Sequence, residues 1–384
     1  MRRYFNLFWI LVFVIGAAIP LFHINTSEIT EQENRTLAKF PKIKNDGKIN
    51  TNYSKEFESW LGDRFWGRNQ LINVRFQTLY KINGRIENEK AFIGDDGWMF
   101  EKWKTVNLPS IKKQRERIEK DAQILERFAG KFKGKNIPIY LVLIPEREVL
   151  YQKYWERYYK PKTHLDYGDE MTRLLKDTPI TVINSNKEML EAMETEEVFY
   201  KDDMHLTSFG IHILLDKVYT SLKEKELDDR IKPAKTNKRK ERKHVAGIAA
   251  RLGLPGRVEI EENIYSMWFP GFKYHELEKR RSVKVKNDLF GSENIVYRKG
   301  VGENAPLNKT LISMGPCYSE NIFGLLRPLF SSSIWIRINL RLVYGETVKE
   351  YTIKEIQKLF DLKAGAGIII ITQTDFEYIQ EALK

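Results

Sequence analysis

The hydrophobic positions along the chain follow two alternating patterns, one typical of helices and one typical of buried strands. After Ser110, a residue type that caps helices, apolar side chains recur at helical spacing through residues 111–132, and Gly134 marks the stop. The next run, 137–145, is almost continuously apolar and has the length of a strand. Further runs of this kind occupy 178–184, 309–314, 334–338 and 368–372. Helices alternating with such strands predict an α/β fold, a parallel sheet flanked by helices, and we expect the last run to complete the same sheet.

The residues that precede this alternating region have a different pattern. Apolar residues at i, i+3 and i+4 spacing predict an amphipathic helix over 54–72, interrupted at Asp63-Arg64-Phe65. Residues 91–100 consist of two short apolar runs around Gly94-Asp95-Asp96-Gly97, which predicts a hairpin or turn.

The N-terminus has the pattern of a membrane segment. Residues 5–22 are apolar apart from Asn6, and Arg2 and Arg3 precede them. A helix of this length can cross a hydrocarbon core of about 30 Å. Because bulky residues follow Ala17-Ala18, the cleavage site of a signal peptide is poor, so an uncleaved anchor is favoured over a cleaved peptide. We therefore expect a transmembrane helix at 1–24, an exported segment packing on the core at 25–90, and the main domain at 91–384.

Composition narrows the classes of protein. The chain has 384 residues, with 64 Lys and Arg against 52 Asp and Glu, a net charge of +12. The 42% hydrophobic and 30% charged content excludes a disordered chain. Much of the excess charge lies in Lys232–Lys243, within a basic insertion near 226–259. Its lack of interleaved aromatic residues favours a solvated loop over a nucleic-acid patch, so we expect no nucleic-acid partner. The single cysteine, Cys317, excludes an intramolecular disulfide and a thiolate-rich metal site.

One candidate site is an Asp-x-His sequence. Asp203 and His205 lie just ahead of an amphipathic helix for which Thr207 or Ser208 is a suitable N-cap. A histidine at a junction between a loop and a helix can point into a cleft, with the carboxylate fixing its tautomer. Taken alone, the pair is also compatible with ordinary surface or capping residues.

The second candidate site is the turn Gly315-Pro316-Cys317-Tyr318. It follows a buried strand and precedes a helix, where backbone N–H groups converge and favour an anion. A thiol at such a position has a lowered pKa and higher reactivity. The alternative is that Cys317 is a small buried apolar residue. Ser319, two residues further on, is a weaker candidate nucleophile.

Together the two sites resemble a known family. The segment from Tyr200 to Thr207 resembles the Y-K-T-D-x-H-W-T motif of the AlgX/AlgJ-like alginate O-acetyltransferases, and His244–Leu254 is similar to a further family segment. Other family features follow in the same order over roughly residues 30–325: Glu33-Asn34-Arg35-Thr36-Leu37 with Pro41, Trp60-Leu61 with Asp63-Arg64-Phe65 and Arg68, Phe92-Ile93-Gly94 with Gly97-Trp98-Met99-Phe100, and Leu143-Ile144-Pro145 with Tyr151.

The resemblance implies an exported protein with an SGNH-hydrolase-like catalytic domain. It implies that Asp203 and His205 act with a nucleophile in a later Gly-containing turn, where relatives carry serine and this chain carries Cys317. Asp202 and Leu206 depart from the motif as well. Pro316 removes one backbone N–H from the turn, although Gly315 shapes it and the N–H of Cys317 can still serve an oxyanion hole.

The expected function is that of a membrane-anchored, extracytoplasmic O-acetyltransferase of a cell-surface or secreted polysaccharide. A Cys-His-Asp triad would form an acyl-enzyme at Cys317. The resemblance implies an acetyl donor in the form of a multipass membrane-bound O-acyltransferase. No cofactor or metal is expected. Two alternatives stay open at this point: an SGNH-type acetyl esterase using the same residues, and a catalytically inactive polysaccharide-binding or scaffold protein of an acetylation complex.

Overall fold

The computed structural model describes most of the chain. The described residues are 8–10, 14, 24–26, 29–30, 35–45, 47–83, 86–245, 247–252, 257–281, 295–338, 345–373 and 376–384. Most of the predicted N-terminal anchor lies outside them. Within the described part, no helix is both long enough and apolar enough to cross a bilayer.

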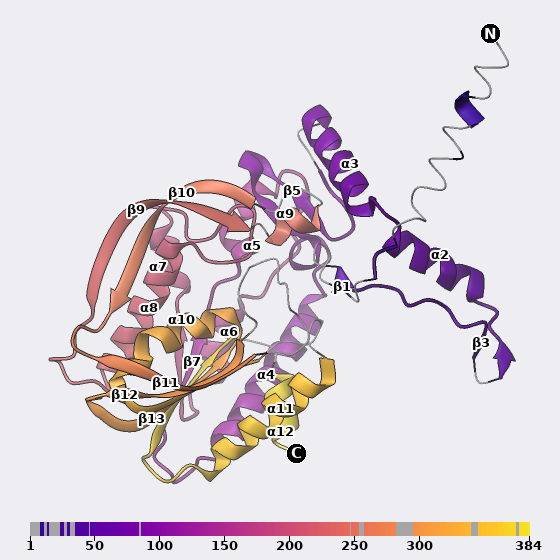
Figure 1. The fold of residues 1–384 in the computed structure, drawn as a ribbon. Helices are drawn as coiled ribbons and strands as arrows, with labels where there is room; N and C mark the ends of the chain where they lie inside the picture. The colour runs from indigo at the N-terminus through magenta and orange to yellow at the C-terminus, as the bar shows by residue number, and fades with distance from the viewer. Residues whose placement is uncertain are drawn as a thin grey trace.

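A seven-stranded sheet forms the centre of the molecule (Figure 1). Its strand order is β11-β12-β14-β13-β15-β7-β8. Five neighbouring strands are parallel: β14 (Phe330–Arg337), β13 (Leu307–Gly315), β15 (Gly367–Thr372), β7 (Ile139–Leu143) and β8 (Ile180–Asn184). The predicted apolar runs all lie in these five strands. As expected, the last run, β15, belongs to the sheet, where it lies between β13 and β7.

The prediction of a wholly parallel sheet is wrong at one edge. Strands β11 (Lys273–Arg281) and β12 (Ile295–Glu303) pair antiparallel with each other, and β12 pairs antiparallel with β14. The sequence of β11 is rich in charged residues, so it lacks the apolar run of a strand that is buried on both faces. An antiparallel edge tolerates solvent on one face, and such strands therefore escape a search for buried runs.

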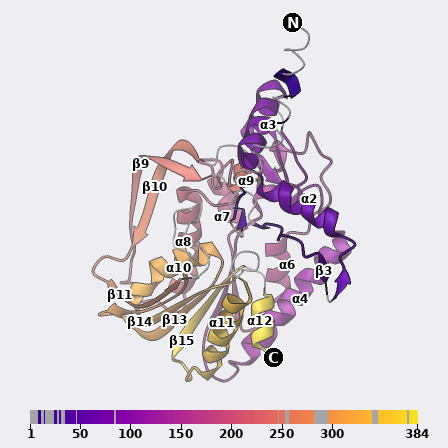
Figure 2. The same cartoon turned by 45° about the vertical axis from the view of Figure 1, so that its right-hand side comes forward.

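Helices cover both faces of the sheet, and the alternation of side chains along each strand divides the core in two. In β15, Ile368 and Ile370 belong to one apolar cluster, and Ile369 and Ile371 to the other. The first cluster includes α8 (Ser208–Lys223) and α10 (Cys317–Leu326). The second includes residues of α4 (Ile111–Gly130), α6 (Tyr167–Leu174), α11 (Gly345–Lys358) and α12 (Glu377–Ala382), which lie together on the other side in Figure 2. As predicted, Ser110 caps α4, its side chain accepting a hydrogen bond from the N–H of Lys113.

Several short elements complete the body of the fold. The predicted hairpin is β5 (Ala91–Ile93) paired antiparallel with β6 (Met99–Glu101). The short helices are α5 (Arg147–Leu150), α7 (Asn186–Ala192) and α9 (Gly247–Arg251). Single 3₁₀ turns occupy Asp95–Gly97, Lys102–Lys104, Gln152–Tyr154, Arg327–Leu329 and Leu359–Asp361.

The basic segment is a strand rather than the predicted solvated loop. Strand β9 (Ala234–Val245) pairs antiparallel with β10 (Arg257–Trp268) along its whole length. Tyr265 of β10 packs on Phe209 of α8, with ring centroids 5.0 Å apart. The prediction from charge is wrong because the partner strand supplies the backbone hydrogen bonds that hold β9 extended, and a polar sequence does not exclude that pairing.

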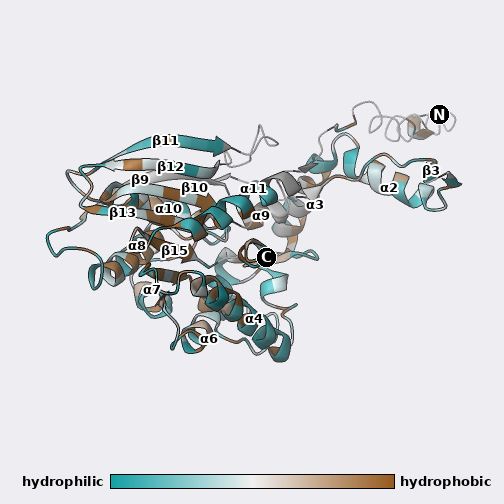
Figure 3. Cartoon of the chain, turned by 90° about the horizontal axis from the view of Figure 1, so that it is seen from below, coloured by the Kyte–Doolittle hydropathy of each residue, from teal (hydrophilic) through white to brown (hydrophobic). Residues whose placement is uncertain are grey.

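The N-terminal part of the described chain forms a projecting arm. The predicted helix over 54–72 is two helices, α2 (Tyr53–Arg64) and α3 (Arg68–Asn83), separated at the predicted break. Two small strand pairs precede them, β1 (Ile29–Thr30) with β2 (Arg35–Thr36) and β3 (Lys44–Asn45) with β4 (Lys48–Ile49). Ile72 and Leu79 of α3 pack on a small apolar cluster that contains β5. In contrast, α2 and β3 extend away from the sheet (Figures 1 and 3).

Replacing Ile370 by alanine tests the central position of β15. Ile370 is fully buried between Ser313 of β13 and Tyr140 of β7. Removing its branched side chain leaves a cavity that rigid neighbouring strands fill poorly, so we expect a loss of about 2–5 kcal/mol in the free energy of unfolding. Urea denaturation measures this value. Leu277→Ala at an exposed position of β11 is the control, and an equal effect of both changes would contradict the core placement.

Candidate active site

Two loops at the carboxyl edge of the parallel strands hold the residues that the sequence singled out. Asp203 and His205 lie in a turn closed by the isolated bridge between Phe199 and Leu206. Thr207 then caps α8: its hydroxyl accepts a hydrogen bond from the N–H of Gly210 at 3.1 Å and donates one to the carbonyl of Glu197 at 2.7 Å. Cys317 lies two residues after the end of β13 and is the first residue of α10.

The fold brings the three predicted residues into hydrogen-bonding distance. His205 Nδ1 lies 2.8 Å from Asp203 Oδ1, and His205 Nε2 lies 3.2 Å from Cys317 Sγ, although the last two residues are 112 positions apart in sequence. This is the order of contacts in a nucleophile–base–orienter triad, where the carboxylate fixes the ring and the other ring nitrogen faces the nucleophile.

Asp203 is held as a hydrogen-bond acceptor inside the protein. Its side chain is fully buried, and its Oδ1 also accepts a hydrogen bond from the backbone N–H of His205 at 3.1 Å. Oδ2 accepts from the N–H of Gly247 at 3.1 Å, at the start of α9. The next two N–H groups of α9, from Ile248 and Ala249, donate to the carbonyl of Asp202. Residue-level reasoning missed Gly247, and only the family resemblance of His244–Leu254 pointed to this segment.

The electrostatics of the pair favour a thiolate and an imidazolium. Burial opposes protonation of His205, but its hydrogen bonds to Asp203 and Cys317 outweigh this and raise the pKa of His205 to about 10. Burial raises the pKa of the Cys317 thiol, yet the hydrogen bond and charge of His205, the charge of Arg337 and the N–H of Tyr318 together lower it below its ordinary value. A thiolate is the nucleophilic form of cysteine, so a lowered pKa favours the reactive form of Cys317.

Glycine is required at the turn before the nucleophile. Gly315 has φ +152°, and a Cβ there would lie 2.8 Å from Cβ of Thr372 and 3.0 Å from Cβ of Ser319. Pro316 takes the N-cap position of α10, so the missing proline N–H does not interrupt the helix. The N–H groups of the first helical turn have no carbonyl in a preceding turn to bind. The N–H of Cys317 can therefore still contribute to an oxyanion hole.

Ser319 has a structural place in this turn. Its side chain is fully buried, its hydroxyl donates to the carbonyl of Pro316 at 2.6 Å, and it accepts a hydrogen bond from Nε1 of Trp335 at 2.8 Å. These contacts leave Cys317 as the stronger of the two candidate nucleophiles.

Tyr318 links the two loops directly. Its hydroxyl donates to the carbonyl of Met204 at 2.8 Å, between the two catalytic candidates of the other loop, and its ring centroid lies 5.7 Å from that of His205. Burial and the negative charges of Cys317 and Asp203 raise the pKa of Tyr318 well above its ordinary value. The hydroxyl therefore stays protonated and keeps donating.

Arg147 supports the loop of Asp203 from behind, and sequence reasoning missed it. Its guanidinium is buried and donates to the carbonyls of Tyr200 at 3.0 and 3.1 Å, Lys201 at 2.7 Å and Met99 at 2.7 Å. It also lies 5.0 Å from the ring centroid of Trp98. The only signal in the sequence is an arginine just after the apolar run 137–145, at the carboxyl end of a buried strand.

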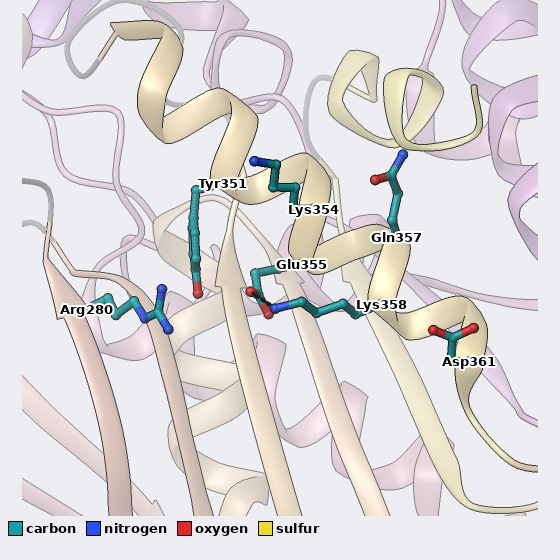
Figure 4. A pocket seen from close by; sticks show the side chains of 7 residues that line it. All are labelled: Arg280, Tyr351, Lys354, Glu355, Gln357, Lys358 and Asp361. Carbon is teal, nitrogen blue, oxygen red and sulfur yellow. Dashed lines mark hydrogen bonds and ion pairs between the residues drawn. The ribbon is translucent and has the colours of Figure 1, made fainter.

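Other polar features lie apart from the triad. Among the described side chains, no group of three or more His, Cys, Asp and Glu could hold a metal ion. His164 and His275 are paired with carboxylates, Glu146 at 2.8 Å and Glu303 at 3.0 Å. A cavity of about 450 Å³ between β11 and α11 has Arg280 over the ring of Tyr351 and Lys358 bonded to Glu355 (Figure 4). It contains none of the predicted site residues.

Replacing His205 by alanine tests the thiolate. Because the pKa of Cys317 is lowered, we expect its alkylation by iodoacetamide at neutral pH to be faster than that of an ordinary thiol, and to slow as the pH falls through that pKa. Without His205 the pKa returns to at least the ordinary range, where about 3% of a thiol is ionised at pH 7, so the rate should drop at least about tenfold. His164→Ala is the matched control because His164 is also paired with a carboxylate. An unchanged rate in His205→Ala would contradict the ion pair.

Replacing Arg147 tests its positioning role through the same titration. Arg147→Met leaves three carbonyls of buried loops without a donor, which releases the turn that carries Asp203 and His205. We expect the midpoint of Cys317 alkylation to shift to higher pH. Arg147→Lys should shift the midpoint less, because lysine keeps the positive charge and can donate to some of the three carbonyls. The exposed Arg157→Met is the control. A folded Arg147→Met variant with an unshifted midpoint would show that Arg147 only stabilises the fold.

Comparisons with known proteins identify a matching family. A family model described as "SGNH hydrolase-like domain, acetyltransferase AlgX" matches residues 91–296, more than half of the chain. The match includes Asp203 and His205 and ends before Cys317. No curated protein is similar enough in sequence to match the chain.

Two solved structures are similar to the fold. PatB1 from Bacillus cereus with a sulfonyl adduct has 13% identity and a TM-score of 0.50, over 78% of this chain and 98% of that one. The O-acetyltransferase domain of Pseudomonas putida AlgJ has 9% identity and a TM-score of 0.48, over 77% of this chain and 98% of that one. From the family match, the chain belongs to the SGNH hydrolase-like acetyltransferases of the AlgX family, as its sequence motifs predicted.

Proposed function

We propose that this protein is a membrane-anchored, extracytoplasmic O-acetyltransferase that acetylates a cell-surface or secreted polysaccharide through Cys317, His205 and Asp203. The observation that supports this most directly is the chain of two contacts, 2.8 Å from Asp203 to His205 and 3.2 Å from His205 to Cys317. Membership in a family of acetyltransferases is the second observation that supports the proposal.

The first half-reaction loads the enzyme. The Cys317 thiolate attacks the carbonyl carbon of the acetyl donor, and a sulfur–carbon bond forms. The bond from that carbon to the donor's leaving group breaks, and the His205 imidazolium gives its Nε2 proton to the leaving group. The N–H of Cys317 faces the developing negative charge on the carbonyl oxygen. The product is an acetyl thioester and a neutral imidazole.

The second half-reaction transfers the acetyl group. Neutral His205 accepts the proton of a sugar hydroxyl, and the hydroxyl oxygen attacks the thioester carbon. An oxygen–carbon bond forms, the sulfur–carbon bond breaks, and the thiolate–imidazolium pair is restored. Asp203 accepts a hydrogen bond from Nδ1–H of His205 in both steps and takes no proton, so Nε2 always faces the sulfur.

The setting of the reaction is also part of the proposal. The apolar run 5–22 with Arg2 and Arg3 supports an N-terminal anchor with the main domain exported. Acetyl groups would come from a multipass membrane-bound O-acyltransferase, and the acceptor is a polysaccharide. The thioester mechanism needs no metal and no further cofactor, since the thiolate, the imidazolium and the backbone N–H groups supply each role.

Replacing Cys317 tests the proposal. In cells that carry Cys317→Ala, the acetate content of the surface polysaccharide should fall to that of cells lacking the protein. In vitro, mass spectrometry of the wild type with an acetyl donor should find the acetyl group on Cys317. Ser319→Ala is the matched control and should still acquire the group on Cys317, because its hydroxyl serves Pro316 and Trp335.

Three results would contradict the proposal. Polysaccharide that stays acetylated in Cys317→Ala would exclude Cys317 as the nucleophile, and an acetyl ester found on Ser319 would assign that role to Ser319. Release of free acetate at an undiminished rate with acceptor oligosaccharide present, without acetylation of the oligosaccharide, would make the enzyme an esterase.

A further inference from the structure

Exposed large apolar side chains are concentrated in the projecting arm. Within the described residues of 40–82, seven such side chains are exposed: Phe40, Ile43, Ile49, Trp66, Leu71, Val74 and Ile82. The much longer described part from residue 86 to the C-terminus has five: Trp103, Val149, Leu190, Trp268 and Leu277. Scattered single residues of this kind are normal, but a cluster on one element marks an interaction surface.

The tip of the arm carries three of these seven exposed apolar side chains. We call residues 39–49 the arm tip; it contains the β3–β4 pair. Phe40, Ile43 and Ile49 are 57%, 69% and 75% exposed. Four lysines alternate with them, Lys39, Lys42, Lys44 and Lys48, and all four are exposed. The tip contains one acidic residue, Asp46, so its net charge is positive.

The arm tip has a defined shape. The Phe40 ring packs edge-on against Trp60 of α2, with centroids 4.8 Å apart. The side chain of Asn50 donates to the carbonyl of Lys42 at 3.0 Å and to Glu56 at 2.9 Å, and its backbone N–H donates to the carbonyl of Ile43 at 2.9 Å. These contacts hold the tip against α2 in a defined conformation, in which its apolar side chains are exposed to solvent.

An anionic lipid surface is the binding partner that matches these exposed apolar and positively charged side chains. Exposed isoleucine and phenylalanine side chains between lysines suit the boundary between headgroups and acyl chains, where apolar groups insert and ammonium groups stay at the phosphates. The proposed anchor at 1–24 lies just before the tip in sequence. The residues from 25 to 39 can span at most about 50 Å, which keeps the tip near the bilayer.

We infer that the arm tip binds the surface of the same bilayer that holds the N-terminal anchor, through Phe40, Ile43 and Ile49 and the four lysines. This inference rests on the anchor in the proposed function and adds a second, peripheral contact to it. The contact would set the distance and orientation of the catalytic domain relative to the membrane.

A fluorescent probe at the tip tests the inference in the full-length chain. Because Cys317 is the single cysteine, Cys317→Ala allows labelling at one new position. Ile43→Cys carries an environment-sensitive dye at the tip, and Leu277→Cys, equally exposed on β11, is the matched control. Both proteins are reconstituted into vesicles of phosphatidylcholine, with or without phosphatidylglycerol, that contain lipids brominated along the acyl chain.

We expect bromine quenching and a blue shift for the dye at residue 43, stronger with phosphatidylglycerol, and neither effect for the dye at 277. Changing Lys39, Lys42, Lys44 and Lys48 together to glutamine should reduce the fraction of inserted tip at least about tenfold, because it removes the positive charges that are attracted to the anionic surface. Aromatic and apolar residues of the tip are unchanged in that variant, and circular dichroism checks separately that the protein still folds.

Each contrary outcome has a distinct meaning. If the protein floats with the vesicles but the dye at residue 43 stays in water, the inference about the arm tip is wrong and the proposed N-terminal anchor is retained. If the dye is shielded only when a membrane-embedded acyl donor is reconstituted too, a protein covers the tip and the lipid inference is wrong. If the full-length chain does not float with the vesicles at all, both the proposed anchor and this inference are wrong. The acetylation test of Cys317 is unaffected by that result.

Discussion

The contact between His205 Nε2 and Cys317 Sγ is the interaction on which the site depends. It joins two loops that are 112 residues apart, and each loop is held by a different part of the fold. The sulfur is placed by the end of β13 and the first turn of α10. The imidazole is placed by a turn that accepts hydrogen bonds from the side chain of Arg147 and from the backbone N–H of Gly247. A shift in the sheet or in either support would change a distance that chemistry tolerates within a few tenths of an ångström.

A cysteine in this position changes the electrostatics of the family's site. A serine hydroxyl beside a histidine stays neutral until it attacks, whereas a thiol beside a raised-pKa histidine ionises beforehand. The charges of His205 and Arg337 and the N–H of Tyr318 lower the pKa of the Cys317 thiol. None of these groups depends on the backbone N–H that Pro316 lacks. The buried carboxylate of Asp203 balances the imidazolium charge at the other end.

The predictability of the fold depends on how each strand is buried. Strands covered on both faces, such as β7 and β15, must be apolar throughout, and a periodicity analysis finds them. Strands at the antiparallel edge carry charges on an exposed face, and β11 and β12 were missed for that reason. The basic strand β9 was predicted as a loop, because its extended form comes from pairing with β10 and not from its own side chains. The predicted break at Asp63-Arg64-Phe65 coincides with the end of α2, where Phe65 has an extended backbone. The last residues of α2 hold the preceding segment: Asp63 accepts from the N–H of Ala38, and Arg64 donates to the carbonyls of Ala38 and Asn25.

Local sequence was enough to determine the α/β class, the two chemical motifs and the family, because residue types and short spacings carry that information. Local sequence also placed Cys317 after a buried strand and His205 before a helix. Only the packing of the sheet decided that these two side chains are in contact. It also decided that the Ser319 hydroxyl accepts a hydrogen bond from Trp335, and that Arg147 and Gly247 donate hydrogen bonds to the loop of Asp203. These relations join segments far apart in the chain, and their distances are set by which strands are neighbours. Spacing along the sequence contains no measure of that arrangement.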